Sequence, residues 1–112
     1  MRLLAGFDAG QTHTRCRLSV VQNGVHQPGE GEGPGVSHLD APQGERRFLE
    51  AISTSAQEAV KNHPDGVIQA AVVGASGIEH GTALQQRAGR LVGQALAIGL
   101  SLIHISEPTD RG

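Results

Sequence analysis

The sequence predicts an α/β fold, in which a mixed sheet that begins with an antiparallel hairpin packs against two helices. Residues Leu3 to Phe7 form a short apolar run, and residues 15–21 alternate polar with apolar side chains, which is the period of a half-buried strand. Two later segments, 45–62 and 82–96, repeat their apolar residues at helical spacing. The run 67–73 between them is apolar enough for a buried strand.

The turn of the first hairpin has the composition of a phosphate-binding turn. Gly10 lets the backbone approach a ligand that a Cβ would block, and the hydroxyls of Thr12 and Thr14 would add hydrogen-bond donors. Asp8 would hold a hydrated Mg²⁺, which prefers one or two carboxylates together with phosphate oxygens. Since Asp and Gly are also the usual residues of tight turns, an ordinary hairpin is the alternative.

The segment after the second strand is rich in turn residues and in glycine. Asn23-Gly24 is a signal for a two-residue hairpin turn, because both central positions of a type I′ turn need a positive φ. The returning segment, Val25 to Glu32, is weak as a strand, because Pro28 cannot donate to a ladder, and this would place it at a sheet edge or end it early. Glycine then stands at every second position, which indicates a backbone that bends or that something approaches closely; a flexible surface loop is the alternative. These glycines are Gly29, Gly31, Gly33 and Gly35.

The remaining elements follow from helical periodicity and from helix breakers. The first helix should run from Glu45 to about Asn62 and stop before the breaker cluster Pro64-Asp-Gly66. The strand Val67 to Val73 should end in the glycine-containing turn 74–77. The second helix should run from about Thr82 to Leu96.

Composition limits the size of the core and the classes of partner. A chain of 112 residues has room for one domain, and with two Phe, no Trp and no Tyr its core must be thin. The net charge is −2 and the basic residues are scattered, which argues against a nucleic-acid or membrane partner. Cys16 is the single cysteine, and its place on the apolar side of the alternating strand predicts a buried thiol. The chain shows no secretory or membrane-spanning apolar run, so the reduced cytoplasm is the expected location.

Three short motifs resemble those of one protein superfamily, in the same order. Asp8-Ala-Gly-Gln-Thr-His-Thr-Arg15 resembles the first phosphate motif, Asp-x-Gly-x-Thr-x-(Thr/Ser)-(Lys/Arg), of the actin, Hsp70 and sugar-kinase superfamily. Gly31-Glu-Gly-Pro-Gly-Val-Ser-His-Leu39 and Val72-Val-Gly-Ala-Ser-Gly-Ile78 resemble the next two motifs of the BadF/BadG/BcrA/BcrD ATPase group, which includes N-acetylglucosamine and glucosamine kinases. The resemblance implies the N-terminal part of a ribonuclease H-like, actin-like ATPase domain.

The resemblance further implies an N-terminal fragment of an ATP-dependent amino-sugar kinase, with ATP and Mg²⁺ as cofactors and a small sugar as substrate. The ATP contacts would come from Asp8, Gly10, Gln11, Thr12 and Thr14, with Mg²⁺ held by Asp8 through water. The sugar contacts would come from Ser37, His38 and Gly77. Ser37 departs from the Asn that mammalian-type N-acetylglucosamine kinases carry there, which leaves the identity of the sugar open.

The catalytic carboxylate of such kinases, which accepts the proton of the sugar hydroxyl, follows a later strand. We therefore expect no catalytic residue in this chain and no kinase activity from it. A homodimer of the longer parent protein is left open.

The last residues resemble a sequence of technical origin. Leu100-Ser-Leu-Ile-His-Ile-Ser-Glu-Pro-Thr109 matches one reading frame of the transposon-end adapter used to prepare sequencing libraries. We therefore expect residues 1–99 to be a truncated N-terminal kinase lobe and residues 100–112 a non-native tail, so that His104 and Glu107 carry no functional argument. The alternative is a genuine C-terminal strand from Leu100 to Ile105. A half-domain of this kind should be marginally stable or prone to aggregation, because it exposes a strand edge and apolar helix faces.

Two other functions are compatible with the sequence. One is an ATPase that activates a partner enzyme, as the BadF-like activators do for acyl-CoA reductases or dehydratases. Those activators carry iron–sulfur cysteines, and this chain has only Cys16. The other is a small non-enzymatic α/β interaction domain whose glycine-rich turns bind no ligand.

Overall fold

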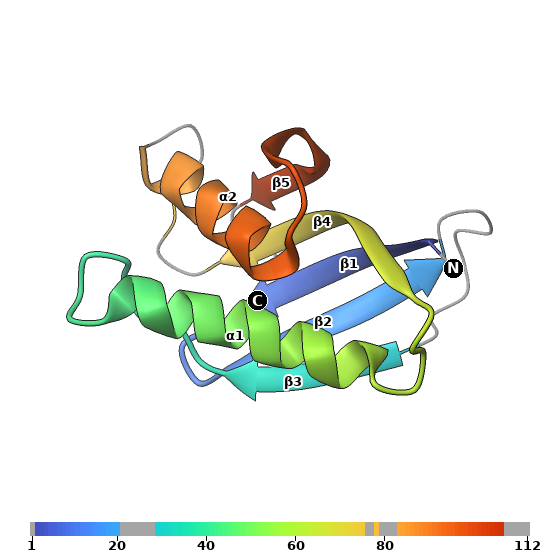
Figure 1. The fold of residues 1–112 in the computed structure, drawn as a ribbon. Helices are drawn as coiled ribbons and strands as arrows, with labels where there is room; N and C mark the ends of the chain where they lie inside the picture. Colours follow the sequence, from blue (N-terminus) through green and yellow to red (C-terminus); the bar gives the residue numbers. More distant parts are fainter. Residues whose placement is uncertain (1, 21–28, 76–77, 79–82, 107–112) are drawn as a thin grey trace.

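The described part of the chain forms a five-stranded mixed sheet with two α-helices on one of its faces (Figure 1). The computed structural model describes residues 2–20, 29–75, 78 and 83–106. The strands are β1 (Arg2–Ala9), β2 (His13–Val20), β3 (Gly29–Pro34), β4 (Val67–Ala75) and β5 (Ile103–Ser106). The helices are α1 (Gly44–Val60), α2 (Ala83–Leu96) and the short 3₁₀ helix η1 (Leu100–Leu102). The predicted α/β fold class is confirmed.

The sheet has the order β3-β2-β1-β4-β5 and mixes two kinds of pairing. Strand β2 pairs antiparallel with both β1 and β3, whereas β4 pairs parallel with both β1 and β5. The predicted opening hairpin is therefore present, and its two strands are each longer than the sequence indicated. The predicted Asn23-Gly24 turn lies outside the described residues.

The helices cover only one face of the sheet, and the period of two in the strands follows from that. In β1 the side chains of Leu3, Ala5 and Phe7 are buried beneath the helices, while Leu4 and Asp8 alternate with them on the opposite face. This opposite face has no covering element among the described residues, and we call it the open face. The helix predictions are confirmed for α1, which ends two residues earlier than expected, and for α2 from Ala83 onward.

Gly29, Gly31 and Gly33 lie in a strand at the sheet edge, so the flexible-loop alternative was wrong for them, and Gly35 follows the strand. Residues 25–28 lie outside the described part, and β3 extends two residues beyond the predicted end at Glu32, to Pro34. A proline is tolerated at the end of an edge strand, where no further ladder bond is required of it.

The glycines of β3 let the backbone of α1 lie directly on the strand. A Cβ added to Gly29 would stand 2.3 Å from the carbonyl oxygen of Ala59, and one added to Gly31 would stand 2.3 Å from that of Ser55. A Cβ on Gly33 would stand 2.9 Å from the Ala51 carbonyl oxygen. Four helix residues advance about 6 Å, close to the ~6.7 Å of two strand residues. Every second residue of β3, a glycine, therefore meets every fourth residue of α1, an alanine or serine.

Cys16 is fully buried, as its place in the alternating strand predicted. Burial raises the pKa of its thiol to about 12, because the apolar surroundings disfavour the thiolate. The core around it is aliphatic and small, and its largest fully buried side chain is Phe48.

The segment after α2 adds a strand to the sheet. The sequence left open a C-terminal strand from Leu100 to Ile105. In the structure this segment begins with η1 and continues as β5, which pairs with β4 through residues 103–106. The adapter origin of this segment stays a prediction. No helix in the described part of the chain is long and apolar enough to cross a membrane.

The close packing of α1 on β3 gives a stability prediction. Gly31→Ala should destabilise the fold by about 1–3 kcal/mol, because the new methyl would meet backbone atoms of Ser55 and Ala59 that cannot move independently. The matched control is Gly99→Ala, where nothing lies within 4 Å of the added Cβ and the change should stay within about 0.5 kcal/mol. Urea unfolding of the two variants measures the difference, and equal midpoints would contradict the packing.

The burial of Cys16 predicts a protected thiol. Labelling by a small thiol reagent at pH 8 should be at least about a hundredfold slower in the folded chain than in denaturant, because both access and the thiolate fraction are low. Mass spectrometry follows the reaction. Similar rates in both states would mean that β2 does not hold Cys16 in the core.

Candidate functional site

Those predicted site residues that the structure describes lie where four strands end. Strands β1, β3, β4 and β5 run in the same direction, so their carboxyl ends meet at one edge of the sheet, at the left of Figure 1. The turn that precedes β2 lies at this edge too, because β2 runs the opposite way. Ligands of open α/β sheets commonly bind just outside the carboxyl ends of the strands.

The phosphate-motif turn is tight and leaves two residues at its tip. The Gly10 N–H donates to the His13 carbonyl at 3.0 Å, so the backbone reverses through Gln11 and Thr12, which are both exposed. The Gly10 amide is therefore engaged within the turn.

The segment after β3, residues 35–38, packs against this turn. The Val36 N–H donates to the Gly10 carbonyl at 2.9 Å, and a Cβ on Gly35 would stand 2.0 Å from the Gln11 carbonyl oxygen. Only glycine permits such an approach between two backbones. The predicted phosphate segment and the predicted sugar segment are therefore in direct contact.

Asp8 and Thr14 lie on opposite faces of the hairpin. Asp8 is paired with Arg15 across the ladder and is exposed on the open face, whereas Thr14 is paired with Ala9 and is fully buried on the helix side. The Thr14 hydroxyl has no hydrogen-bond partner within the described residues. The structure thus places the Thr14 hydroxyl away from the Asp8 carboxylate.

A shallow pocket of about 300 Å³ opens on the open face beside Asp8. Two arginines that sequence reasoning did not select line it with Asp8: Arg15, which pairs with Glu32 at 3.6 Å, and Arg17, which pairs with Glu30 at 2.9 Å. The sequence pattern could have identified the two arginines, since the period of two in the strand puts both on the same face as Asp8. The rest of the pocket is lined by Gly6, Phe7, Val72, Gly74 and Ser106.

Among the predicted sugar contacts, Ser37 and His38 lie in the segment next to the turn. The Ser37 hydroxyl is buried and has no partner within the described residues, whereas the His38 side chain is half exposed. The His38 Nδ1 accepts a hydrogen bond from the Asp40 N–H at 3.1 Å. The neutral ring that this geometry assigns carries its hydrogen on Nε2. The third predicted contact, Gly77, lies outside the described residues.

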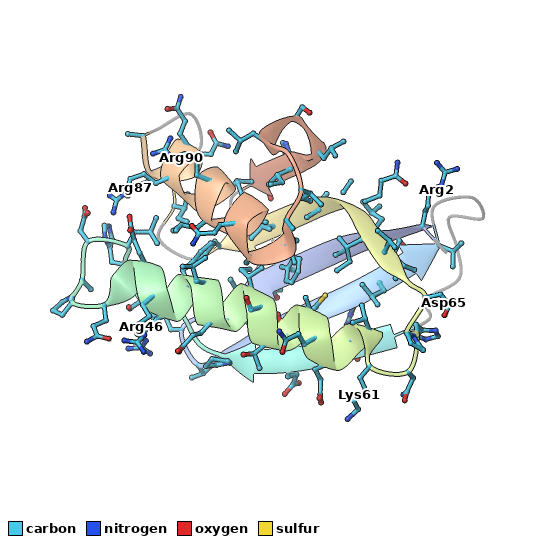
Figure 2. The ribbon with its side chains drawn as sticks, viewed as in Figure 1. Arg2, Arg46, Lys61, Asp65, Arg87 and Arg90 are labelled. Atoms are coloured by element: carbon cyan, nitrogen blue, oxygen red, sulfur yellow. The ribbon has the colours of Figure 1, made fainter. Side chains whose placement is uncertain are left out.

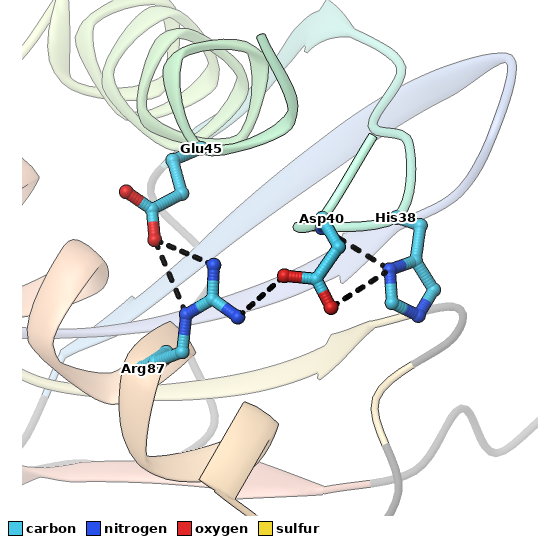
Figure 3. A network of polar contacts seen from close by, with 4 residues as sticks. All are labelled: His38, Asp40, Glu45 and Arg87. Atoms are coloured by element: carbon cyan, nitrogen blue, oxygen red, sulfur yellow. Dashed lines mark hydrogen bonds and ion pairs between the residues drawn. The ribbon is translucent and has the colours of Figure 1, made fainter. Parts of the chain in front are cut away.

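A surface network ties this segment to α2, and Figure 3 shows its members. The Arg87 guanidinium donates to Asp40 Oδ1 at 2.8 Å and to Glu45 Oε2 at 2.8 Å. The hydrogen bond and then the charge of Arg87 hold the pKa of Asp40 below its ordinary value, and the two carboxylates raise the pKa of Arg87. Sequence reasoning missed this network, because its partners stand more than forty residues apart and share no spacing pattern.

The residues present fit Mg²⁺ only as a companion of a bound phosphate. Within the described part of the chain, no group of three or more His, Cys, Asp or Glu residues could hold a metal ion. The Asp8 carboxylate is exposed at the pocket and makes no ion pair with another described residue. One carboxylate with phosphate oxygens and water is a usual way for proteins to bind Mg²⁺.

The Asp40 carboxylate gives a prediction about pH. Its lowered pKa means that the stabilisation from the Arg87 contact is present above the unfolded value of about 3.9 and is lost as the pH falls through the lower folded value. Arg87→Gln should move the pKa of Asp40 upward, toward its ordinary value. A carboxyl-carbon NMR titration measures the midpoint, with Arg46→Gln as control, because Arg46 pairs with Glu50 instead. An unchanged midpoint in Arg87→Gln would contradict the network.

Comparison with known proteins supports the fold assignment. No family model matches the sequence, and no curated protein matches it. The chain is similar to a crystal structure from Chromobacterium violaceum whose activity as an N-acetylglucosamine kinase is itself a prediction, with a TM-score of 0.63 and 25% sequence identity. The match covers 96% of this chain and 35% of the other, so this chain spans about a third of that protein. The fold is therefore sugar-kinase-like and consistent with a fragment of an actin-like ATPase domain.

Proposed function

We propose that this chain is the N-terminal part of an ATP-dependent amino-sugar kinase of the BadF/BadG/BcrA/BcrD type. The observation that carries the proposal is the contact between the turn 10–13 and the segment 35–38 at the carboxyl edge of the sheet. A kinase must hold the transferring phosphate and the accepting sugar next to each other, and this contact puts the two candidate segments side by side.

On the phosphate side, the tip of the turn supplies donors and Asp8 supplies charge. The backbone N–H groups of Gln11 and Thr12 and the Thr12 hydroxyl are the groups that a phosphate can reach, because the Gly10 amide is engaged with His13. Asp8 would hold Mg²⁺ through water, and that ion would neutralise charge on the phosphates when bound.

On the sugar side, the segment 35–38 offers a short polar wall. His38 presents an Nε2–H donor for a sugar oxygen, and Ser37 can donate or accept once its side chain turns out of its buried position. Gly77, outside the described residues, is the third proposed sugar contact. The proton acceptor for the sugar hydroxyl is proposed to belong to a part of the protein that corresponds to the region of the Chromobacterium violaceum structure outside the match.

The proposal predicts Mg²⁺-dependent ATP binding without phosphate transfer. Asp8→Asn should weaken Mg²⁺-ATP binding by about tenfold or more, because it removes the only charge proposed to hold the ion. Without Mg²⁺ the variant and the unsubstituted 112-residue chain, called the parent chain below, should bind ATP with the same affinity. The control Glu58→Gln removes an exposed carboxylate of α1 that pairs with Lys61, and it should leave binding unchanged.

Calorimetric titration or amide NMR shifts measure this binding. No detectable ATP binding by the folded 112-residue chain would reject the phosphate-binding role proposed for the turn 10–13, and ATP protection of the longer protein would reject the interaction domain. ATP binding unaffected by Asp8→Asn would reject the role of Asp8. In the longer parent protein, phosphate transfer to glucosamine or N-acetylglucosamine would separate the kinase from an ATPase activator.

A further inference from the structure

We infer that Arg87 is a positioning residue, which acts through Asp40 to hold the His38 ring with its Nε2–H free to donate to a sugar oxygen. The inference rests on the proposed function for the identity of that sugar. The positioning itself rests on the network in Figure 3, where the His38 Nδ1 faces Asp40 and the other ring nitrogen points away from it.

The first step is the link from α2 to the loop before α1. Arg87 reaches Asp40 with Nη1 and Glu45 with Nη2 and Nε, at distances of 2.8, 2.8 and 3.2 Å. A planar guanidinium with two engaged sides has a restricted orientation, which a lysine ammonium could not reproduce. Arg87 therefore joins the loop and the first turn of α1 to α2.

The second step is the link from Asp40 to the imidazole. The Asp40 N–H donates to His38 Nδ1 at 3.1 Å, and Asp40 Oδ2 lies 4.0 Å from the same atom. The His38 carbonyl accepts from the Ala41 N–H at 2.9 Å, and a Cβ on Gly44 would stand 2.2 Å from that carbonyl oxygen. The backbone of His38 is thus fixed by the loop, and its ring accepts from the backbone N–H of Asp40, whose side chain is held by Arg87.

The third step concerns what the network contributes. The side chains of Arg87, Asp40 and Glu45 are 29%, 66% and 50% exposed, and surface ion pairs of this kind add little to stability. Their proposed contribution is to the orientation of the loop, in addition to the Ala41 hydrogen bond and the packing of Gly44. A substitution at Arg87 should therefore alter the state of His38 while leaving unfolding nearly unchanged.

The experiment compares Arg87→Gln with Arg90→Gln in the whole 112-residue chain. Arg90 lies one turn further along α2, is exposed and carries the same charge, so it is a matched control (Figure 2). Two-dimensional NMR of the imidazole nitrogens reports which ring nitrogen of His38 carries hydrogen, with His38→Asn to assign the signal. Titration with N-acetylglucosamine, and separately with glucosamine, measures sugar affinity.

We expect Arg90→Gln and the parent chain to show a single His38 tautomer with hydrogen on Nε2. Arg87→Gln should show a mixture of the two tautomers and bind the sugar about two- to tenfold more weakly, the range of one lost hydrogen bond. Asp40→Ala keeps the backbone N–H that donates to His38 Nδ1 but removes the carboxylate that Arg87 holds, so it should reproduce both effects through the freed loop. Glu45→Gln should leave the tautomer unchanged, since the Asp40 link remains.

The outcomes separate the inference from the proposed function. A single unchanged tautomer in both Arg87→Gln and Asp40→Ala overturns the positioning role, whatever the parent chain binds. If Arg87→Gln and Asp40→Ala show a mixture of tautomers but the parent chain binds no sugar, the positioning role is supported and the sugar is overturned as the ligand. Sugar affinity that is equal in the parent chain and in Arg87→Gln, despite a changed tautomer, overturns His38 as a sugar contact.

Discussion

The close approach of two backbones, α1 on the glycine strand β3, is the constraint on which the rest of this structure depends. Any side chain at Gly31 would meet the backbone of Ser55 and Ala59, so the helix can sit this near the sheet only because the strand has no Cβ atoms there. A thin core with two Phe and no Trp or Tyr suits this arrangement, since small residues fill the short distance between the layers.

The same constraint sets the position of the candidate site. Where β3 ends, Gly35 continues the close packing, but against the hairpin turn at Gln11 instead of the helix. The loop that follows returns to α1 at Gly44, and Arg87 joins it to α2. The segment with Ser37 and His38 is therefore held from the turn, from α1 and from α2 at once, and a pre-organised segment of this kind suits ligand positioning.

Local patterns predicted most of the fold and only part of the site. Alternation in β2 and helical spacing in α1 and α2 are properties of residues close together in the chain, so they could be recognised from the sequence alone. The packing partner of the glycine strand β3 was harder to predict. Glycine indicates that another group approaches closely but does not indicate which group, and in the structure it is α1. The burial of the Thr14 hydroxyl and the reach of Arg87 to Asp40 depend on tertiary packing, and no local pattern encodes them.

The central claim is that the turn 10–13 binds a metal-bound nucleotide phosphate directly beside the segment 35–38, which contacts the sugar. Paramagnetic broadening by Mn²⁺-ATP tests it directly, because the effect falls steeply with distance from the ion. The account predicts that the amide signals of Gln11, Thr12 and His38 broaden first, while those of the turn near Asp65, at the opposite end of the sheet, stay sharp (Figure 2). Broadening centred on Asp65, or spread evenly over the chain, would contradict it.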